Sequence, residues 1–335
     1  MPGHQTDAIL VTGAAGYIGS QTNKQLVAAG FSTVVLDNLV YGHRESVKWG
    51  HFINADLSDA VQLREVFQAY RITAVVHFAA YTYVGESVTH PQKYYENNVV
   101  STLRLLEMMR EFDVKHMVFS STCATYGVPM QLPIPETHSQ NPINPYGRSK
   151  LMIEQILKDF SHAYGMTFVA LRYFNAAGAD PDGELGEWHV PESHLIPLAA
   201  RAVFDPGFRL QVFGSDYDTP DGTCVRDYIH VVDLADAHIR ALRYLIDGGA
   251  STAFNLGNGK GYSVMEVIRA VEKHCGLPVI YDVAMRREGD PPVLVGDATR
   301  AQSVLEWHQR FAELDMIVGS ALAWHRAHPQ TIGLD

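Results

Sequence analysis

Thr12-Gly13-Ala14-Ala15-Gly16-Tyr17-Ile18-Gly19 follows the apolar run Ala8–Val11 and opens a segment with helical periodicity. Glycine permits tight backbone angles, and the start of a helix offers free N–H groups and the positive end of its dipole. A glycine-rich turn between a strand and a helix is typical of dinucleotide-binding folds, although the spacing here is Gly-x-x-Gly-x-x-Gly. We therefore expect Gly13, Gly16 and Gly19 to face a dinucleotide pyrophosphate.

Strands and helices alternate outward from this turn. We expect strands at 8–11, 33–36, 51–54, 74–78, 117–119 and 167–171, and helices at 17–29, 60–70, 92–112 and from 146 onward. Such alternation is typical of a parallel sheet covered on both faces. Beyond Ala176 the regularity ends, with helices expected at 195–203, 234–245 and 264–274 and strands at 210–213 and 279–282.

These patterns predict an α/β protein in which a Rossmann-type doubly wound parallel sheet is joined to a smaller mixed α/β C-terminal substrate domain. The predicted domains are 1–176 for dinucleotide binding and 177–335 for the substrate. A segment near 225–250 is expected to return to the first domain.

The composition excludes several classes of function. The net charge of −11 argues against nucleic-acid binding, and no apolar run is long enough to span a membrane. Cys123, Cys224 and Cys275 are too widely spaced for a Cys-x-x-Cys pair, and no signal peptide is evident, so we expect a cytoplasmic protein. His189 and His194 lack a familiar ligand spacing, so no metal site is expected.

Acidic residues follow the second and third strands. A carboxylate at Asp37 can accept both hydroxyls of an adenosine ribose and would repel a 2′-phosphate, which favours NAD over NADP. Asp56 has two alternatives that the sequence leaves open: it accepts from the adenine amino group, or it caps the next helix.

Asn144-Pro145-Tyr146-Gly147-Arg148-Ser149-Lys150 supplies a tyrosine and a lysine on one helix face. Asn144 is expected to cap this helix and Pro145 to take its first position. A nearby ammonium, together with the positive nicotinamide, is expected to lower the pKa of Tyr146, so that a phenolate can accept the proton of a sugar hydroxyl as hydride leaves. Thr122, at the end of the fifth strand, is placed to orient the same proton.

The chain resembles the extended short-chain dehydrogenases/reductases and, more narrowly, the UDP-glucose 4-epimerases, also called UDP-galactose 4-epimerases. Besides the two motifs above, the resemblance rests on stretches spread over nearly the whole chain, among them Asp37–Leu39, Val84–Val88, Phe119–Thr122, Leu171–Asn175, Gly222–His230, Asn255–Gly257 and Arg286–Asp290.

The resemblance implies that Tyr146 removes the 4-hydroxyl proton of a UDP-hexose while hydride passes to tightly held NAD. The 4-keto sugar then turns and receives the hydride on its other face, which interconverts UDP-galactose and UDP-glucose. Lys150 would hold the nicotinamide ribose. By the same resemblance two copies would pair through 92–112 and 145–164 as a homodimer.

The resemblance also implies the binding residues. Besides Gly13, Gly16 and Gly19, those around NAD would be Tyr17, Ile18, Asp37, Asn38, Leu39, Val40, Tyr41, Gly42, Asp56, Leu57, Phe78, Ala79, Ala80, Tyr81, Thr82, Asn97, Thr122, Tyr146, Lys150 and Phe174. Those around the UDP-sugar would be Thr122, Tyr146, Asn175, His194, Leu195, Gln211, Val212, Phe213, Arg226, Arg287, Asp290 and Leu294. Guanidinium groups pair with phosphate oxygens bidentately, which suits Arg226 and Arg287.

Three positions depart from the family pattern. Thr82 replaces a lysine of many relatives, His194 an asparagine of some, and Leu294 a tyrosine of hexose-restricted ones. The smaller Leu294 suggests room for a 2-acetamido group, so UDP-N-acetylhexosamines are further candidate substrates.

Three other functions share part of this sequence pattern. A sugar-nucleotide dehydratase would have an acid pair after the threonine, where this chain has Cys123-Ala124. A UDP-pentose or UDP-uronate 4-epimerase shares the core chemistry and stays an alternative. An inactive NAD-sensing regulator would have little need of Tyr146 and Lys150.

Overall fold

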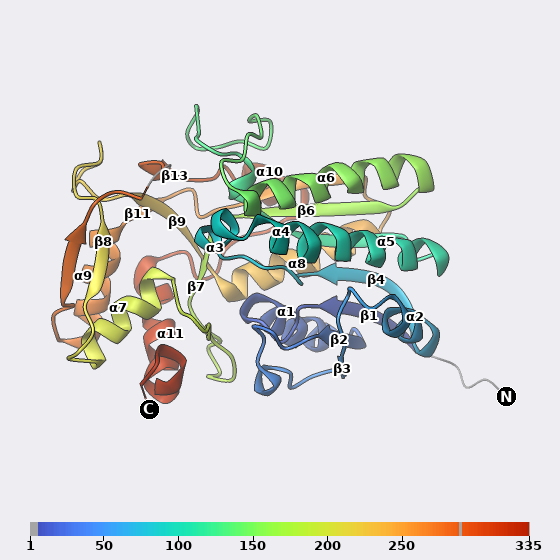
Figure 1. Cartoon of the computed structure of the whole chain (residues 1–335), viewed down its shortest axis with the longest axis horizontal. Helices are drawn as coiled ribbons and strands as arrows, with labels where there is room; N and C mark the ends of the chain where they lie inside the picture. Colours follow the sequence, from blue (N-terminus) through green and yellow to red (C-terminus); the bar gives the residue numbers. More distant parts are fainter. Residues whose placement is uncertain (1–5, 288–289, 335) are drawn as a thin grey trace.

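The structure is a computed structural model and describes residues 6–287 and 290–334. Within these residues, seven parallel strands form the main sheet in the order β10-β6-β5-β4-β1-β2-β3 (Figure 1). They are β1 (Asp7–Thr12), β2 (Thr33–Asp37), β3 (His51–Asn54), β4 (Arg71–His77), β5 (His116–Thr122), β6 (Thr167–Tyr173) and β10 (Thr252–Leu256). The run 3-2-1-4-5-6 is that of the doubly wound dinucleotide-binding fold, so the predicted fold class is confirmed.

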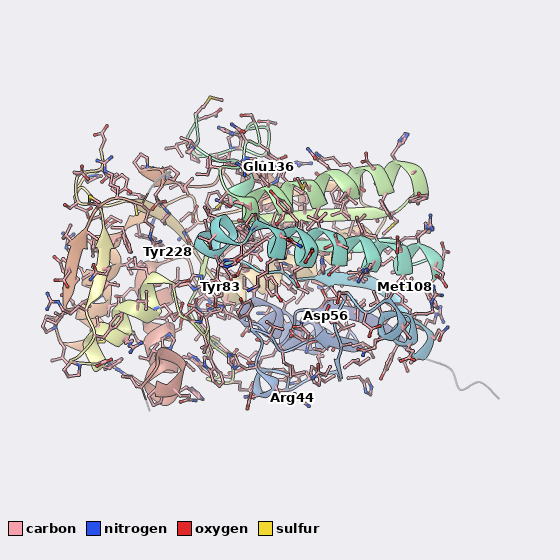
Figure 2. All side chains as sticks on the ribbon, in the orientation of Figure 1. Arg44, Asp56, Tyr83, Met108, Glu136 and Tyr228 are labelled. Atoms are coloured by element: carbon pink, nitrogen blue, oxygen red, sulfur yellow. The ribbon has the colours of Figure 1, made fainter. Side chains whose placement is uncertain are left out.

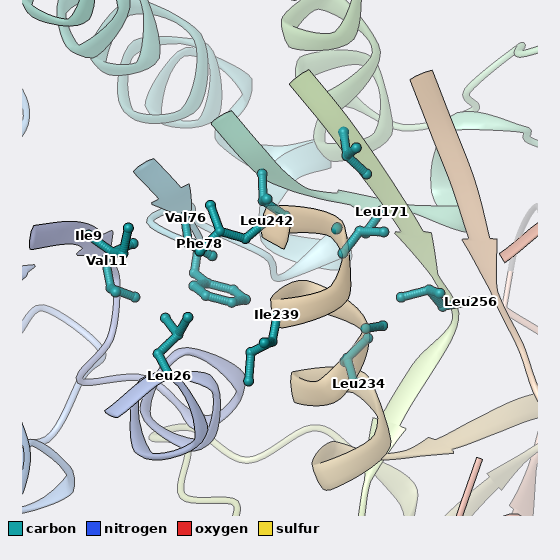
Figure 3. Packing of buried hydrophobic residues seen from close by; sticks show 14 of the residues in the cluster. Ile9, Val11, Leu26, Val76, Phe78, Leu171, Leu234, Ile239, Leu242 and Leu256 are labelled. Atoms are coloured by element: carbon teal, nitrogen blue, oxygen red, sulfur yellow. The ribbon is translucent and has the colours of Figure 1, made fainter. Parts of the chain in front are cut away.

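Helices cover both faces of this sheet. One apolar cluster joins the sheet to α1 (Tyr17–Ala28) and α8 (Val231–Ile246), and Figure 3 shows Leu26, Ile239 and Leu242 closing on Val76 and Phe78. A second cluster joins the other face to α2 (Ala60–Ala69), α5 (Ser101–Glu111) and α6 (Pro145–Tyr164). The two buried layers hold the carboxyl ends of the strands at one edge, where ligands of such sheets bind.

The helix predicted over 92–112 is three segments rather than one. It consists of α4 (Pro91–Tyr94), a π-helical turn η2 (Tyr95–Val100) and α5, and an unpredicted short helix α3 (Val84–Thr89) precedes it. Buried Asn98 in the π turn accepts from Tyr81 N at 2.8 Å and donates to Ser149 Oγ at 3.0 Å. A π turn re-aims side chains within a helix, and this one ties the chain after β4 to α6.

The remaining strands form small sheets, of which sequence periodicity predicts little because most are short. β9 (Val225–His230) pairs with β7 (Asn175–Ala177), β11 (Gly261–Ser263) and β13 (Val293–Leu294), and β8 (Leu210–Phe213) pairs with β12 (Tyr281–Ala284). The strand expected at 279–282 thus lies two residues further on. The helices packed beside them are α7 (Leu195–Phe204), α9 (Val264–Cys275) and α11 (Leu314–Ala327).

Short elements complete the chain: η1 (Arg44–Ser46), η3 (Cys123–Thr125), α10 (Thr299–Val304) and η4 (Pro329–Ile332). None of the described helices combines the length and apolarity that a membrane span requires.

The segment expected to return to the first domain divides at His230. β9 stays in a small sheet, whereas α8 packs against α1 and β10 extends the main sheet beside β6. These contacts support a later return to the first domain, and we retain the boundary at 176/177 as a proposal, although β7 runs across it.

Candidate active site

The glycine turn packs tightly against the chain that follows β4. Gly13 has φ +74°, and a Cβ there would lie 2.5 Å from Ala79 N, closer than real Cβ atoms approach. Gly16 begins α1, and no side chain caps the first N–H groups of the helix. These free donors and the open backbone fit a pyrophosphate, since an anion at this position satisfies both.

Asp37 lies beside this turn at the end of β2. Its carboxylate accepts from Ala15 N and from Leu39 N, each at 2.9 Å, and Leu39 takes a left-handed φ of 60°. Burial raises the pKa of Asp37, whereas the hydrogen bonds from the two backbone N–H groups lower it. The carboxylate is thus held in one orientation and retains oxygen lone pairs for the hydroxyls of a ribose.

The structure removes one of the two alternatives for Asp56, which Figure 2 labels. The cap of α2 is Asp59, which accepts from Val61 N at 3.0 Å and Gln62 N at 3.1 Å. Asp56 instead accepts from Asn38 Nδ2 and Ser58 N, both at 2.7 Å. The interpretation of Asp56 as the helix cap is therefore wrong, and adenine recognition stays the prediction.

Tyr81, the residue before Thr82, lies close to a lysine of α4. Lys93 Nζ lies 4.6 Å from the Tyr81 ring centre and donates to Tyr41 Oη at 2.9 Å and Glu86 Oε1 at 2.7 Å. Tyr41 and Tyr81 also meet edge to face at 5.3 Å. A positive charge therefore lies beside these two tyrosines, although position 82 itself carries no lysine.

Helix α6 carries the predicted catalytic pair. Asn144 Oδ1 accepts from Gly147 N at 2.8 Å and Pro145 takes the first turn, so both expectations for the start of this helix are confirmed. A Cβ at Gly147 would lie 2.5 Å from Ala124 O, which shows how closely α6 approaches the end of β5. This approach buries Tyr146 and Lys150 against that strand, with exposed fractions of 9% and 2%.

The protein groups around Tyr146 do not by themselves lower its pKa, so the expected lowering stays a prediction for the chain with a bound nicotinamide. Burial raises the pKa of Tyr146 above its ordinary value, the nearby Tyr173 adds to the rise, and a hydrogen bond with Thr122 opposes it. Lys150 donates to Ser120 O at 2.8 Å, and burial lowers its own pKa to about 7. In the protein alone, burial therefore favours a neutral phenol at Tyr146 and a partly deprotonated amine at Lys150, because both charged forms lose solvation.

Tyr173 is a site residue that pattern reasoning missed. Its hydroxyl hydrogen-bonds Ser120 Oγ, and it acts on the titration of Tyr146. Its place at the end of β6, beside β5, was the available signal, because the carboxyl ends of adjacent parallel strands meet at one edge.

The predicted diphosphate residues gather on the small sheets. Arg226 of β9 forms an ion pair with Asp290 and donates to Val225 O at 2.8 Å. The Arg287 guanidinium lies 4.0 Å from the Phe213 ring centre. Leu294 of β13 is the register partner of Arg226, so these five residues flank one region. Glu288 and Gly289 of the same motif lie outside the described residues.

One apolar cluster connects this region to the catalytic end of β5. Cys123, which follows Thr122, and Leu294 both pack against buried Tyr126, Ile134 and Phe174. The predicted catalytic and sugar-side residues therefore border the same cluster.

The other predicted substrate residues differ in their contacts and exposure, and so in which groups they have free for a ligand. Asn175 Nδ2 donates to Asp227 O at 3.2 Å, and His194 precedes α7, which begins at Leu195. Gln211 is exposed on β8, whereas Val212 is buried in the core of the small domain. The Val212 side chain is thus directed into packing, and only its backbone remains for a ligand.

Comparisons with known proteins identify the family of the chain. The model of the NAD-dependent epimerase/dehydratase family matches residues 9–257. The chain therefore belongs to this family, as the sequence resemblance predicted.

Within this family, the chain is similar over its length to UDP-glucose 4-epimerases. The chain is 51% identical to a UDP-glucose 4-epimerase of Rhizobium meliloti (strain 1021), over 97% of this chain and 99% of that protein. A crystal structure of UDP-glucose 4-epimerase from Brucella ovis in complex with NAD superposes with a TM-score of 0.92 at 49% identity, covering 95% of this chain and 98% of that one. The UDP-Glc/GlcNAc 4-epimerase of Campylobacter jejuni is similar at 42% identity with a TM-score of 0.84, over 96% and 100% of the two chains.

Proposed function

We propose that this protein is an NAD-dependent isomerase that interconverts UDP-galactose and UDP-glucose through transient oxidation at carbon 4. The observation that carries the proposal is the placement of Tyr146, Lys150 and Thr122 at the carboxyl end of β5, across the sheet edge from the glycine turn. Full-length similarity to UDP-glucose 4-epimerases supports the same activity.

The cofactor site fits the cofactor that the Brucella ovis enzyme holds. The uncapped start of α1 would hold the pyrophosphate of NAD, and Asp37 would accept the hydroxyls of its adenosine ribose. When bound there, NAD would accept a hydride from the sugar and return it. Asp56, the residues after β4, and Asn97 would line its remaining surface.

The proton is handled by the chain's own residues. Tyr146 would accept the proton of the sugar's 4-hydroxyl and later return it, and Thr122, hydrogen-bonded to the phenol, would stabilise the phenolate. Lys150, one helical turn further on, can gain or lose its charge near neutral pH because its pKa is about 7. The buried position of all three side chains excludes water from the transferred hydrogen.

The diphosphate would be held by arginines. Arg226 is oriented by its ion pair with Asp290, and Arg287 lies over Phe213, so both guanidinium groups have a fixed direction. A phosphate oxygen can replace or share such carboxylate contacts. The UDP-sugar would therefore lie between the small sheets and the end of β5.

A dehydratase activity is disfavoured by the residue after Thr122. Burial raises the pKa of the Cys123 thiol to about 12, so it cannot act as the base that expulsion of a 6-hydroxyl requires.

The direct test is to incubate purified protein, without added NAD, separately with UDP-galactose and UDP-glucose. Conversion of each into the other supports the proposal and a resident cofactor. The absence of conversion with both, even after NAD is supplied, rejects the hexose activity; the same assay with a UDP-pentose and a UDP-uronate then tests the alternative.

Activity on UDP-N-acetylhexosamines is a second candidate, favoured by Leu294 beside Arg226 and by similarity to the Campylobacter jejuni UDP-Glc/GlcNAc enzyme. Comparable turnover of UDP-N-acetylgalactosamine and UDP-galactose is expected. Leu294→Tyr should reduce turnover of the acetamido sugar selectively, because the added ring fills its space. No detectable turnover of the acetamido sugar by the unmodified protein would reject this activity.

The assembly and the compartment are proposed on narrower grounds. Exposed Val100, Met152 and Tyr164 on and beside α5 and α6 support a homodimer through these helices. A single monomeric mass in light scattering would contradict it. Three unpaired cysteines support a cytoplasmic location.

A further inference from the structure

The loop before α7 brings two carboxylates and two imidazoles together. Glu187, His189, Glu192 and His194 follow the pattern Glu-x-His-x-x-Glu-x-His, and each offers one ligand atom within 4.8 Å of the others. The proposed proton chemistry uses none of the four. This spacing matches no familiar ligand motif, because a loop rather than a helix places these side chains.

The separations between nitrogen and oxygen suit a small metal ion. His194 Nδ1 lies 2.8 Å from Glu192 Oε1 and 2.9 Å from Glu187 Oε1. His189 Nδ1 lies 3.3 Å from Glu187 Oε1 and 3.6 Å from Glu192 Oε2. Ligand atoms around tetrahedral zinc are about 3.3 Å apart, given bonds of ~2.0 Å. The two separations from His189 are at or above that value, and the two from His194 are shorter, where a direct contact with each carboxylate would open to admit the ion.

Two atoms of the cluster are buried without a hydrogen-bond partner. They are His189 Nδ1 and Glu192 Oε2, and they face each other. The Glu192 side chain is only 9% exposed. Their ion pairs, His189 Nδ1 to Glu187 Oε1 at 3.3 Å and to Glu192 Oε2 at 3.6 Å, do not meet the geometry of a hydrogen bond, and leaving a buried polar atom without one is costly, so both atoms have capacity for a shared ligand.

The charges in and around the cluster also favour a bound cation. Among the described residues, neither Glu187 nor Glu192 forms an ion pair with a lysine or an arginine, and their ion pairs are with the two histidines. The other titratable groups facing the cluster are uncharged or histidine, namely Tyr17, His43, Tyr83 and His325. Two buried carboxylates therefore have no lysine or arginine to offset their charge, and a dication would offset it.

We propose that Glu187, His189, Glu192 and His194 bind one divalent transition-metal ion of the zinc type. Two nitrogens and two carboxylate oxygens suit zinc, whereas magnesium and calcium favour oxygen alone. The ion would fix the loop at the start of α7. Coordination through Nδ1 also keeps the proton of His194 on Nε2, which makes Nε2 a donor for a phosphate oxygen; this consequence rests on the proposed function.

The experiment is a zinc titration of the full-length, chelator-treated protein, read by calorimetry and by thermal unfolding. One ion per chain and a Tm that rises with zinc concentration are expected. Magnesium and calcium should give neither effect. Cobalt in place of zinc should give a tetrahedral d–d spectrum without a thiolate charge-transfer band, which separates this site from the three cysteines.

Glu192→Gln and His189→Gln each remove one ligand with little change in volume, and each should weaken zinc binding by at least ~100-fold. Asp182→Asn, in the acid cluster already occupied by Lys24, is the matched control and should bind zinc normally. The readout is the zinc-dependent shift of Tm, so a change in basal stability does not obscure it. Equal zinc binding by all three variants, a thiolate band, or no binding below millimolar zinc would overturn the proposal.

Discussion

The two sides of the candidate site are built differently. On the β5 side, Lys150 and Thr122 are buried, and backbone contacts or caps hold the helix that carries Tyr146. On the small-sheet side, Arg226 is held by an ion pair with Asp290 and Arg287 by contact with the Phe213 ring. Packing fixes the first side, and charge fixes the second.

Because the two sides are held differently, they suit different functions. Groups that move a proton must be positioned within a narrow range and kept from water, which buried packing achieves. Groups that grip a charged substrate can exchange one partner for another, as Arg226 can exchange Asp290 for a phosphate. We expect substitutions on the first side to lower kcat and those on the second to raise KM.

The largest effect is expected at Tyr146. Tyr146→Phe removes the proton acceptor and keeps the ring, so turnover of UDP-galactose should fall by roughly 10²- to 10⁴-fold. Tyr164→Phe, at the exposed end of the same helix, is the control and should keep full turnover. Near-normal turnover of Tyr146→Phe with an unchanged Tm would remove Tyr146 from the mechanism.

A smaller effect is expected at Arg226. Arg226→Ala deletes a charged hydrogen-bonding group worth about 1.5–3 kcal/mol, so KM should rise roughly 10- to 100-fold with a smaller change in kcat. Arg209→Ala breaks an exposed pair with Asp282 at 2.6 Å in the same small domain and should leave KM unchanged. If Arg226→Ala lowers kcat alone, the contrast between the two sides fails.

The smallest effect concerns the pH dependence of stability. Burial lowers the pKa of Lys150 to about 7 in the folded chain from an ordinary value of 10.5. Between these values the unfolded chain binds more protons at this position, so stability rises with pH, by at most about 1.4 kcal/mol per pH unit. Lys150→Met should remove that rise.

Urea unfolding of both proteins without ligand, from about pH 7 to about pH 9, measures the two slopes. The other titrating groups are common to both, so only Lys150 separates them. Parallel slopes would show that the lysine is not buried as described.

Six of the seven strands of the main sheet were predictable because they are apolar runs that alternate with helices, as at 33–36 and 74–78, whereas β10 was not predicted. The cap at Asn144 was predictable because capping is local. The pKa of Tyr146 was not, because it depends on burial that tertiary packing creates. The ion pair between Arg226 and Asp290 joins residues far apart in the chain, and no local pattern encodes it.

The π turn at 95–100 and the unpaired atoms of the Glu187–His194 loop also escaped sequence reasoning. Asn98 in the π turn bonds to Tyr81 and Ser149, which are distant in the chain, whereas Glu192 contacts histidines of its own loop, which only the course of that loop brings together.

The most direct test of the central claim follows the hydrogen at carbon 4 of the sugar. UDP-galactose carrying deuterium at that carbon is incubated with the purified protein in ordinary water, and the UDP-glucose formed is analysed by mass spectrometry. Transient oxidation, with Tyr146 handling only the hydroxyl proton, predicts that the product retains its deuterium at carbon 4. Loss of the deuterium to water would contradict the account, and so would a failure to form UDP-glucose in the presence of NAD.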